Sequence, residues 1–143
     1  MTQKELNLRF QELKVEYTKK SHKIAQQKQD EDAKKQDALL AADDAFHKEK
    51  RERIAKITKL RIEKAALFDG DPKRAILEAE ARNLESEISV LRDDNERRKR
   101  TICHEFYANI RAFDEQSRLV TEWYEYEKQQ LMKEYNKDGY LTD

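Results

Sequence analysis

The chain has almost none of the residues that interrupt helices: its 143 residues include two glycines and one proline, where average usage would supply about 17. One glycine and the proline lie together near the centre, in the run Asp69-Gly70-Asp71-Pro72. Gly70 suits the left-handed position just past a helix end. Asp71 suits the N-cap of a following helix, and Pro72 suits its first turn. The sequence therefore predicts two long helices joined by one short turn.

Charge dominates the composition of this chain. Charged residues make up 42% of it, with 30 basic and 30 acidic residues, and the residue types AVILMFWYC make up 37%. This apolar fraction is below the usual 45–50% or so, which argues against a conventional globular core. The zero net charge removes the simplest argument for binding nucleic acid or a membrane surface, because both favour an excess of Lys and Arg.

Apolar residues in each half follow the alternating spacing of four and three residues that is typical of a coiled-coil seam, the line along which two helices pack. In the first half this line is Leu6, Phe10, Leu13, Tyr17 and Ile24, and in the second it is Leu77, Ala81, Leu84, Ile88 and Leu91. The second line continues through Asn95, Arg98 and Ile102, and a four-residue step then shifts it onto Phe106, Ile110 and Phe113. Such a step is a stutter, which locally unwinds a coiled coil.

The predicted fold is all-α: a long two-helix antiparallel coiled-coil hairpin that associates into a larger helical bundle. It forms a single helical hairpin over residues 1–143, with a first arm at about 3–69, a turn at 69–72 and a second arm at about 72–137. Lys137 and Gly139 give the stop signal of the second arm. Two straight helices that pair between different chains are the alternative.

A hairpin folded at Gly70 places residues opposite each other when their numbers sum to about 141. Tyr17 then faces Tyr124, and the basic run 97–100 lies opposite Asp43-Asp44. Opposite charges across the two arms fix their register more than they add stability.

One stretch of the second arm lacks apolar partners in this register. Phe106, Ile110 and Phe113 face residues 26–37, which contain no large apolar side chain. Leaving such residues in water forgoes roughly 1.5–3 kcal/mol of burial for each. We therefore expect this segment to contact another protein chain. The alternative is that the first arm bends or loops, so that it covers the segment with Leu39, Leu40 and Phe46.

Two aromatic residues near the free end of the hairpin, Trp123 and Tyr126, point away from the line of Tyr124 and Leu131. They are candidates for an exposed contact surface, because aromatic residues are enriched in interfaces. A broadened seam at the helix ends is the alternative interpretation.

The sequence offers little support for catalysis. His22, His47 and His104 are scattered, and neither a Glu-x-x-His motif nor a glycine-rich phosphate loop is present. We expect no catalytic, metal-binding or cofactor-binding residues and no enzymatic activity. Cys103 lies beside Ile102, where a buried, inert thiol is expected. The single cysteine, the lack of an apolar N-terminal stretch and the absence of long uncharged runs favour the cytoplasm.

The expected function is that of a structural or adaptor protein, which forms a homodimer with a four-helix section around Phe106–Phe113 or docks a protein partner in its open groove. The alternative is a nucleic-acid-associated helical arm that uses Lys48–Arg53 and the basic cluster Arg97, Arg98, Lys99 and Arg100. A partly disordered chain that folds on its partner is a third interpretation.

Overall fold

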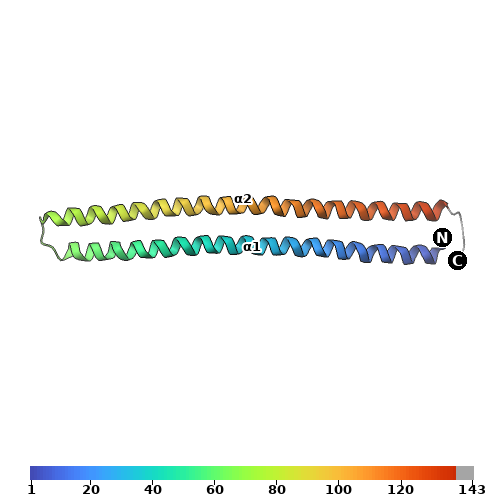
Figure 1. Ribbon diagram of the computed structural model, residues 1–143, viewed down its shortest axis with the longest axis horizontal. Helices are drawn as coiled ribbons and strands as arrows, with labels where there is room; N and C mark the ends of the chain where they lie inside the picture. Colours follow the sequence, from blue (N-terminus) through green and yellow to red (C-terminus); the bar gives the residue numbers. More distant parts are fainter. Residues whose placement is uncertain (138–143) are drawn as a thin grey trace. The chain divides into compact units, whose positions relative to one another are not determined.

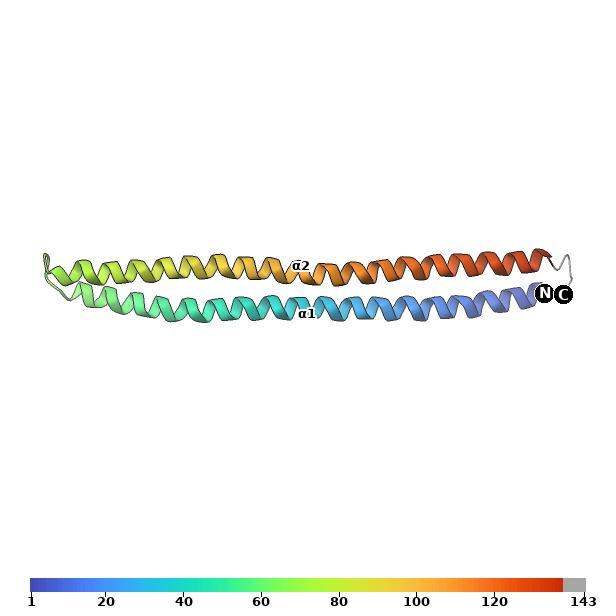
Figure 2. The ribbon, with the colours of Figure 1, turned by 45° about the horizontal axis from the view of Figure 1, so that its top comes forward.

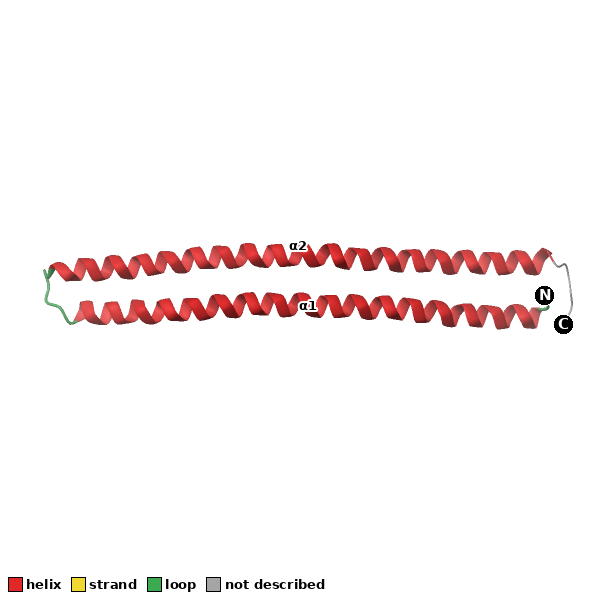
Figure 3. Cartoon of the chain, viewed as in Figure 1, coloured by secondary structure: helices red, strands yellow, loops and turns green. Residues whose placement is uncertain are grey.

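The computed structural model describes residues 1–137, and the described chain consists of two helices and the turn between them. Helix α1 spans Gln3–Ala65, and helix α2 spans Pro72–Lys137. Figure 3 shows both helices in red and the connecting turn in green. The two helices pack against each other, so the predicted all-α helical hairpin is confirmed. Gly139, the predicted stop signal, lies outside the described residues.

Capping residues lie at both helix starts, and the one at Asp71 is predicted by the sequence. The backbone N–H of Glu5 donates to the Thr2 hydroxyl at 3.2 Å. The backbone N–H of Lys73 donates to the Asp71 carboxylate at 2.9 Å. Each bond satisfies an amide that has no partner inside its own helix. Gly70 has φ +89°, which is the left-handed conformation expected of it at this turn.

The end of α1 differs from the prediction, because the helix stops at Ala65 rather than near Asp69. The guanidinium of Arg74, on α2, donates to the backbone carbonyls of Lys64 at 3.1 Å and Leu67 at 2.8 Å. These carbonyls lie at the helix end, where the usual intrahelical donors are missing. A side chain of the second helix therefore caps the first.

Packing divides the chain into two compact units, and each contains a segment of both helices. The turn unit is residues 34–105. The terminal unit is residues 1–33 together with the chain from Phe106 onward. The boundary on α1 lies within the polar run 26–37, where the sequence offers no large apolar side chain for a core.

The turn unit has a small apolar core between its two helix segments. Ile57, Ala81 and Ile88 are buried, and Leu60 and Leu84 pack against them. Ion pairs cross between the helices beside this core; Lys64, for example, contacts Glu78 at 3.1 Å. This bond is the main reason that the pKa of Glu78 lies below its ordinary value.

The terminal unit packs through aromatic and aliphatic residues. Leu6, Leu13 and Ile24 of α1 are buried. Tyr17 stacks on Tyr124 with ring centroids 4.3 Å apart, which confirms the predicted pair. Figures 1 and 2 show the segments of α1 and α2 in each unit running side by side.

Candidate protein-interaction surface

The aromatic segment of α2, defined as Phe106, Ile110 and Phe113, is only partly covered by α1. All three side chains are half-buried. The bonds to α1 in this region are polar: Lys28 contacts Asp114 at 2.7 Å, and Asn109 donates to Glu31 at 2.9 Å. The polar run of α1 therefore contacts this part of α2 through an ion pair and a hydrogen bond rather than through apolar packing.

Helix α1 is uninterrupted through residues 26–44, so the alternative in which the first arm loops back is wrong. Leu39 and Phe46 are half-buried, and Leu40 is 61% exposed, all within the turn unit. A continuous helix does not fold back on itself within this stretch. The side chains of the aromatic segment remain partly open to solvent in the single chain.

Trp123 and Tyr126 differ in exposure although they lie three residues apart. Trp123 is half-buried, and the ammonium group of Lys20 lies 3.8 Å from the centroid of its ring. A cation at this distance from an indole face is held by a favourable cation–π interaction. Tyr126 is 58% exposed. Trp123 thus lies at the edge of the helix pair, whereas Tyr126 lies outside it.

The charged residues beside this surface are bonded along α2 itself. The Arg118 guanidinium donates to Glu115, and it also donates to Glu122 at 2.6 Å. The hydrogen bond between Arg118 and Glu115 lowers the pKa of Glu115 and raises the pKa of Arg118. Arg118 therefore compensates two carboxylates on the outer face of the helix.

The basic cluster is partly engaged in structural contacts. Lys99 contacts Asp43 of α1 at 3.2 Å, which confirms the predicted pairing of the basic run with this acidic position. Arg97 contacts Asp94 of its own helix at 2.7 Å. The side chains of Arg98 and Arg100 are exposed.

The prediction that Arg98 lies on the seam is wrong. Arg98 is exposed, whereas Lys99 is half-buried and occupies the inward position. The inward line of α2 takes two successive four-residue steps here, from Leu91 to Asn95 and then to Lys99, so a stutter precedes the one that the apolar pattern indicates.

Asn95 and Asp43 form a polar contact across the turn unit. The Asn95 side chain is 8% exposed and donates to the Asp43 carboxylate at 2.9 Å. This hydrogen bond, followed by the one from Lys99, lowers the pKa of Asp43. A satisfied polar group on the seam sets helix register, because any slip would leave it buried without a partner.

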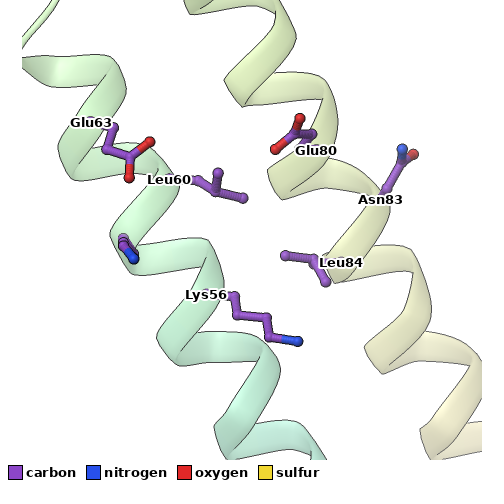
Figure 4. Close-up of a pocket in the computed structure, with 7 residues that line it drawn as sticks. Lys56, Leu60, Glu63, Glu80, Asn83 and Leu84 are labelled. Carbon is purple, nitrogen blue, oxygen red and sulfur yellow. The ribbon is translucent and has the colours of Figure 1, made fainter.

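An open groove lies in the turn unit, at a position that the sequence does not specify. Leu60 and Leu84 point toward each other across it, as Figure 4 shows, and its volume is about 430 Å³. Its rim is charged and polar, with Lys56, Glu63 and Glu80 among the residues that line it. The sequence identifies Leu84 as a seam residue, but spacing alone does not show which side of the seam stays open.

The groups that often carry chemistry are dispersed. Among residues 1–137, no group of three or more His, Cys, Asp or Glu side chains is arranged to hold a metal ion. Cys103 is exposed, so the expectation of a buried thiol is wrong. One residue along a helix is a turn of about 100°, which moves Cys103 away from the half-buried Ile102. Neither described helix has a segment apolar enough to cross a membrane.

Comparison of the chain with protein-family models, curated proteins and solved structures gives no match.

Proposed function

We propose that this chain is a non-enzymatic coiled-coil protein whose terminal unit binds another protein chain, as part of a homo-oligomer or by docking a protein partner. The observation that carries this proposal is the half-buried state of Phe106, Ile110 and Phe113 beside a polar stretch of α1. Full burial of a side chain of this size contributes about 1.5–3 kcal/mol. A further helix placed over the segment would recover the part of this burial that α1 leaves unused.

The composition of the chain supports the same proposal. Two helices alone leave much of a coiled-coil seam open on both sides, and stable domains cover such faces with a further layer. The zero net charge imposes no long-range repulsion between copies. A structural or adaptor role, in the cytoplasm, fits a pair of helices with a protein-binding face.

Replacement of Ile110 by Asp tests the proposal. A charge at this position penalises burial against a partner, so the variant should lose the higher-mass species that the unmodified chain forms in sedimentation velocity. The matched control is Val90→Asp, since Val90 is 57% exposed in the turn unit. Loss of assembly in both variants, or in neither, would contradict a role for the aromatic segment.

A second candidate function, a nucleic-acid-associated arm, is favoured by the exposure of Arg98 and Arg100. It is opposed by the ion pairs that Arg97 and Lys99 already make. Titration of a short duplex at low and high salt tests it, because phosphate contacts weaken steeply with salt. Salt-sensitive binding that disappears on Arg98→Ala and Arg100→Ala would favour this candidate over the protein-binding one.

A further inference from the structure

Helix α2 carries a second line of uncharged residues, outside the seam that it shares with α1. We call this line the outer stripe: Ala112, Gln116, Leu119, Trp123, Tyr126 and Gln130. The steps between its members alternate between four and three residues, so all six lie on one face of the helix. In a chain that is 42% charged, an uncharged face of this length indicates contact with another helix.

The outer stripe is open in the single chain. Leu119 is 50% exposed and Tyr126 is 58% exposed. Trp123 and Gln130 are half-buried, whereas Ala112 and Gln116 are exposed. Lys20 covers part of the Trp123 ring on the side of α1. The apolar centre of the stripe, from Leu119 to Tyr126, therefore lacks a packing partner on its outer side.

We propose that the outer stripe packs against the same stripe of a second copy, with the two α2 helices antiparallel about a two-fold axis near Thr121. The spacing of the stripe reads the same in both directions, as four, three, four, three and four residues. An antiparallel pair centred there places Leu119 of each copy opposite Trp123 of the other. Such self-complementarity is what a two-fold interface requires.

The ends of the stripe match in the same arrangement. Ala112 lies opposite Gln130 of the second copy, and Gln116 lies opposite Tyr126. A small residue then meets a long amide, and a second amide meets a phenol that can hydrogen-bond with it. No pair along the stripe places two charges of the same sign in contact.

The stripe has an inner flank, on the side of the half-buried residues of α2, and an outer flank on its exposed side. The contacts on these two flanks explain how the arrangement tolerates charge. On the inner flank, the half-buried Val120 meets its own symmetry mate. On the outer flank, Glu122 approaches Glu122 of the second copy, and the Arg118 bond at 2.6 Å compensates each carboxylate. Phe113 lies on the inner flank as well, so a second copy that covers the stripe also extends toward the aromatic segment.

This inference rests on the proposed function and makes it more specific: the partner is a second copy, and the contact is centred on the outer stripe. Different results would overturn the proposed function and the inference about the outer stripe. Assembly that Ile110→Asp abolishes but stripe variants do not would leave the proposed function standing and overturn the inference.

Spin-label distances test the antiparallel arrangement. In a Cys103→Ser background, labels at Arg111→Cys would lie about 20 residues apart along the shared axis, or about 30 Å at 1.5 Å per residue. Labels at Glu122→Cys would lie within about 20 Å of each other, because the axes of two packed helices are only about 8–10 Å apart. Short distances at both positions would indicate parallel pairing and overturn the proposal.

Sedimentation equilibrium tests the surface itself. Leu119→Glu and Tyr126→Glu should each weaken the dimer at least tenfold, because each places two charges in the centre of the interface. Val15→Glu is the matched control, since Val15 is 54% exposed on α1 in the same unit. Circular dichroism should show unchanged helicity in all three variants. A monomeric unmodified chain, or equal weakening by Val15→Glu, would overturn the proposal.

Discussion

The two units use the same pair of helices and leave different parts of their surface open. The turn unit closes on its own core of Ile57, Ala81 and Ile88 and has a polar pair, Asp43 and Asn95, that sets register. The terminal unit keeps three large residues of α2 half-buried and exposes an uncharged outer stripe. The buried core and the polar pair of the turn unit favour one arrangement of the two helices, and we propose that the terminal unit provides the surface for assembly.

The largest effect should distinguish two matched substitutions, each of which shortens an isoleucine side chain to alanine. Ile88→Ala should lower the free energy of unfolding by about 2–4 kcal/mol, because Ile88 is 8% exposed and its loss leaves a cavity. Ile110→Ala should cost about 1 kcal/mol in dilute protein, because Ile110 is only half-buried. Chemical unfolding monitored by circular dichroism measures both. Equal losses would remove the distinction between the two units.

The turn supplies the next largest effect. Gly70→Ala should destabilise the chain by about 1 kcal/mol, because an alanine pays a steric cost in the left-handed conformation that Gly70 adopts. A Cβ at this position would meet no atom within 4 Å, so the cost is conformational. Gly70→Asn, which tolerates this conformation better, is the control and should cost less in thermal unfolding.

The polar pair of Asp43 and Asn95 should make a smaller contribution to the free energy of unfolding, and this contribution should depend on pH. The folded pKa of Asp43 lies below its ordinary value because Asn95 and Lys99 bond to its carboxylate. Its contribution to stability is therefore complete above the unfolded pKa of about 3.9, and it is lost as the pH falls through the lower folded value.

Unfolding of the native chain and of Asp43→Asn, measured from neutral pH into acid, tests this linkage. The difference between the two should stay constant above the unfolded pKa and shrink in more acidic solution. A difference that grows on acidification would contradict the assigned role of Asp43.

The smallest expected effect comes from the ion pair between Lys28 and Asp114 in the terminal unit. Both side chains are about half exposed, at 46% and 58%. Lys28→Gln should change the free energy of unfolding by less than about 1 kcal/mol, because solvent screens such pairs. A loss comparable to that of Ile88→Ala would mean that polar contacts, rather than the apolar core, hold the chain together.

Much of the fold was predictable because it depends on short-range rules. One glycine-proline break and a regular apolar spacing are enough to predict two long helices, and the fixed turn then determines which residues face each other. The stacking of Tyr17 on Tyr124 and the contact between Lys99 and Asp43 follow from that geometry.

The structure differs from the sequence predictions where contacts between the two helices, rather than the local sequence, determine the conformation. Arg74 donates to the Lys64 carbonyl in the last turn of α1 and to the Leu67 carbonyl just beyond it, contacts that no pattern within α1 indicates. The inward position of Lys99 depends on a four-residue step from Asn95, which the apolar pattern does not show because both residues are polar. Cys103 is exposed because its neighbour Ile102 takes the inward position. The open side of the groove at Leu60 depends on how the helices pack together.

The central claim, that a second copy covers the terminal unit, is tested most directly by the fluorescence of Trp123, the single tryptophan of the chain. Its emission and its quenching by acrylamide can be followed through a dilution series from roughly 100 to 0.1 µM. Because the proposed dimer would cover the part of the Trp123 ring that the single chain leaves exposed, emission should shift to longer wavelength and quenching should increase on dilution. An emission maximum and a quenching constant that stay the same at every concentration would contradict the account.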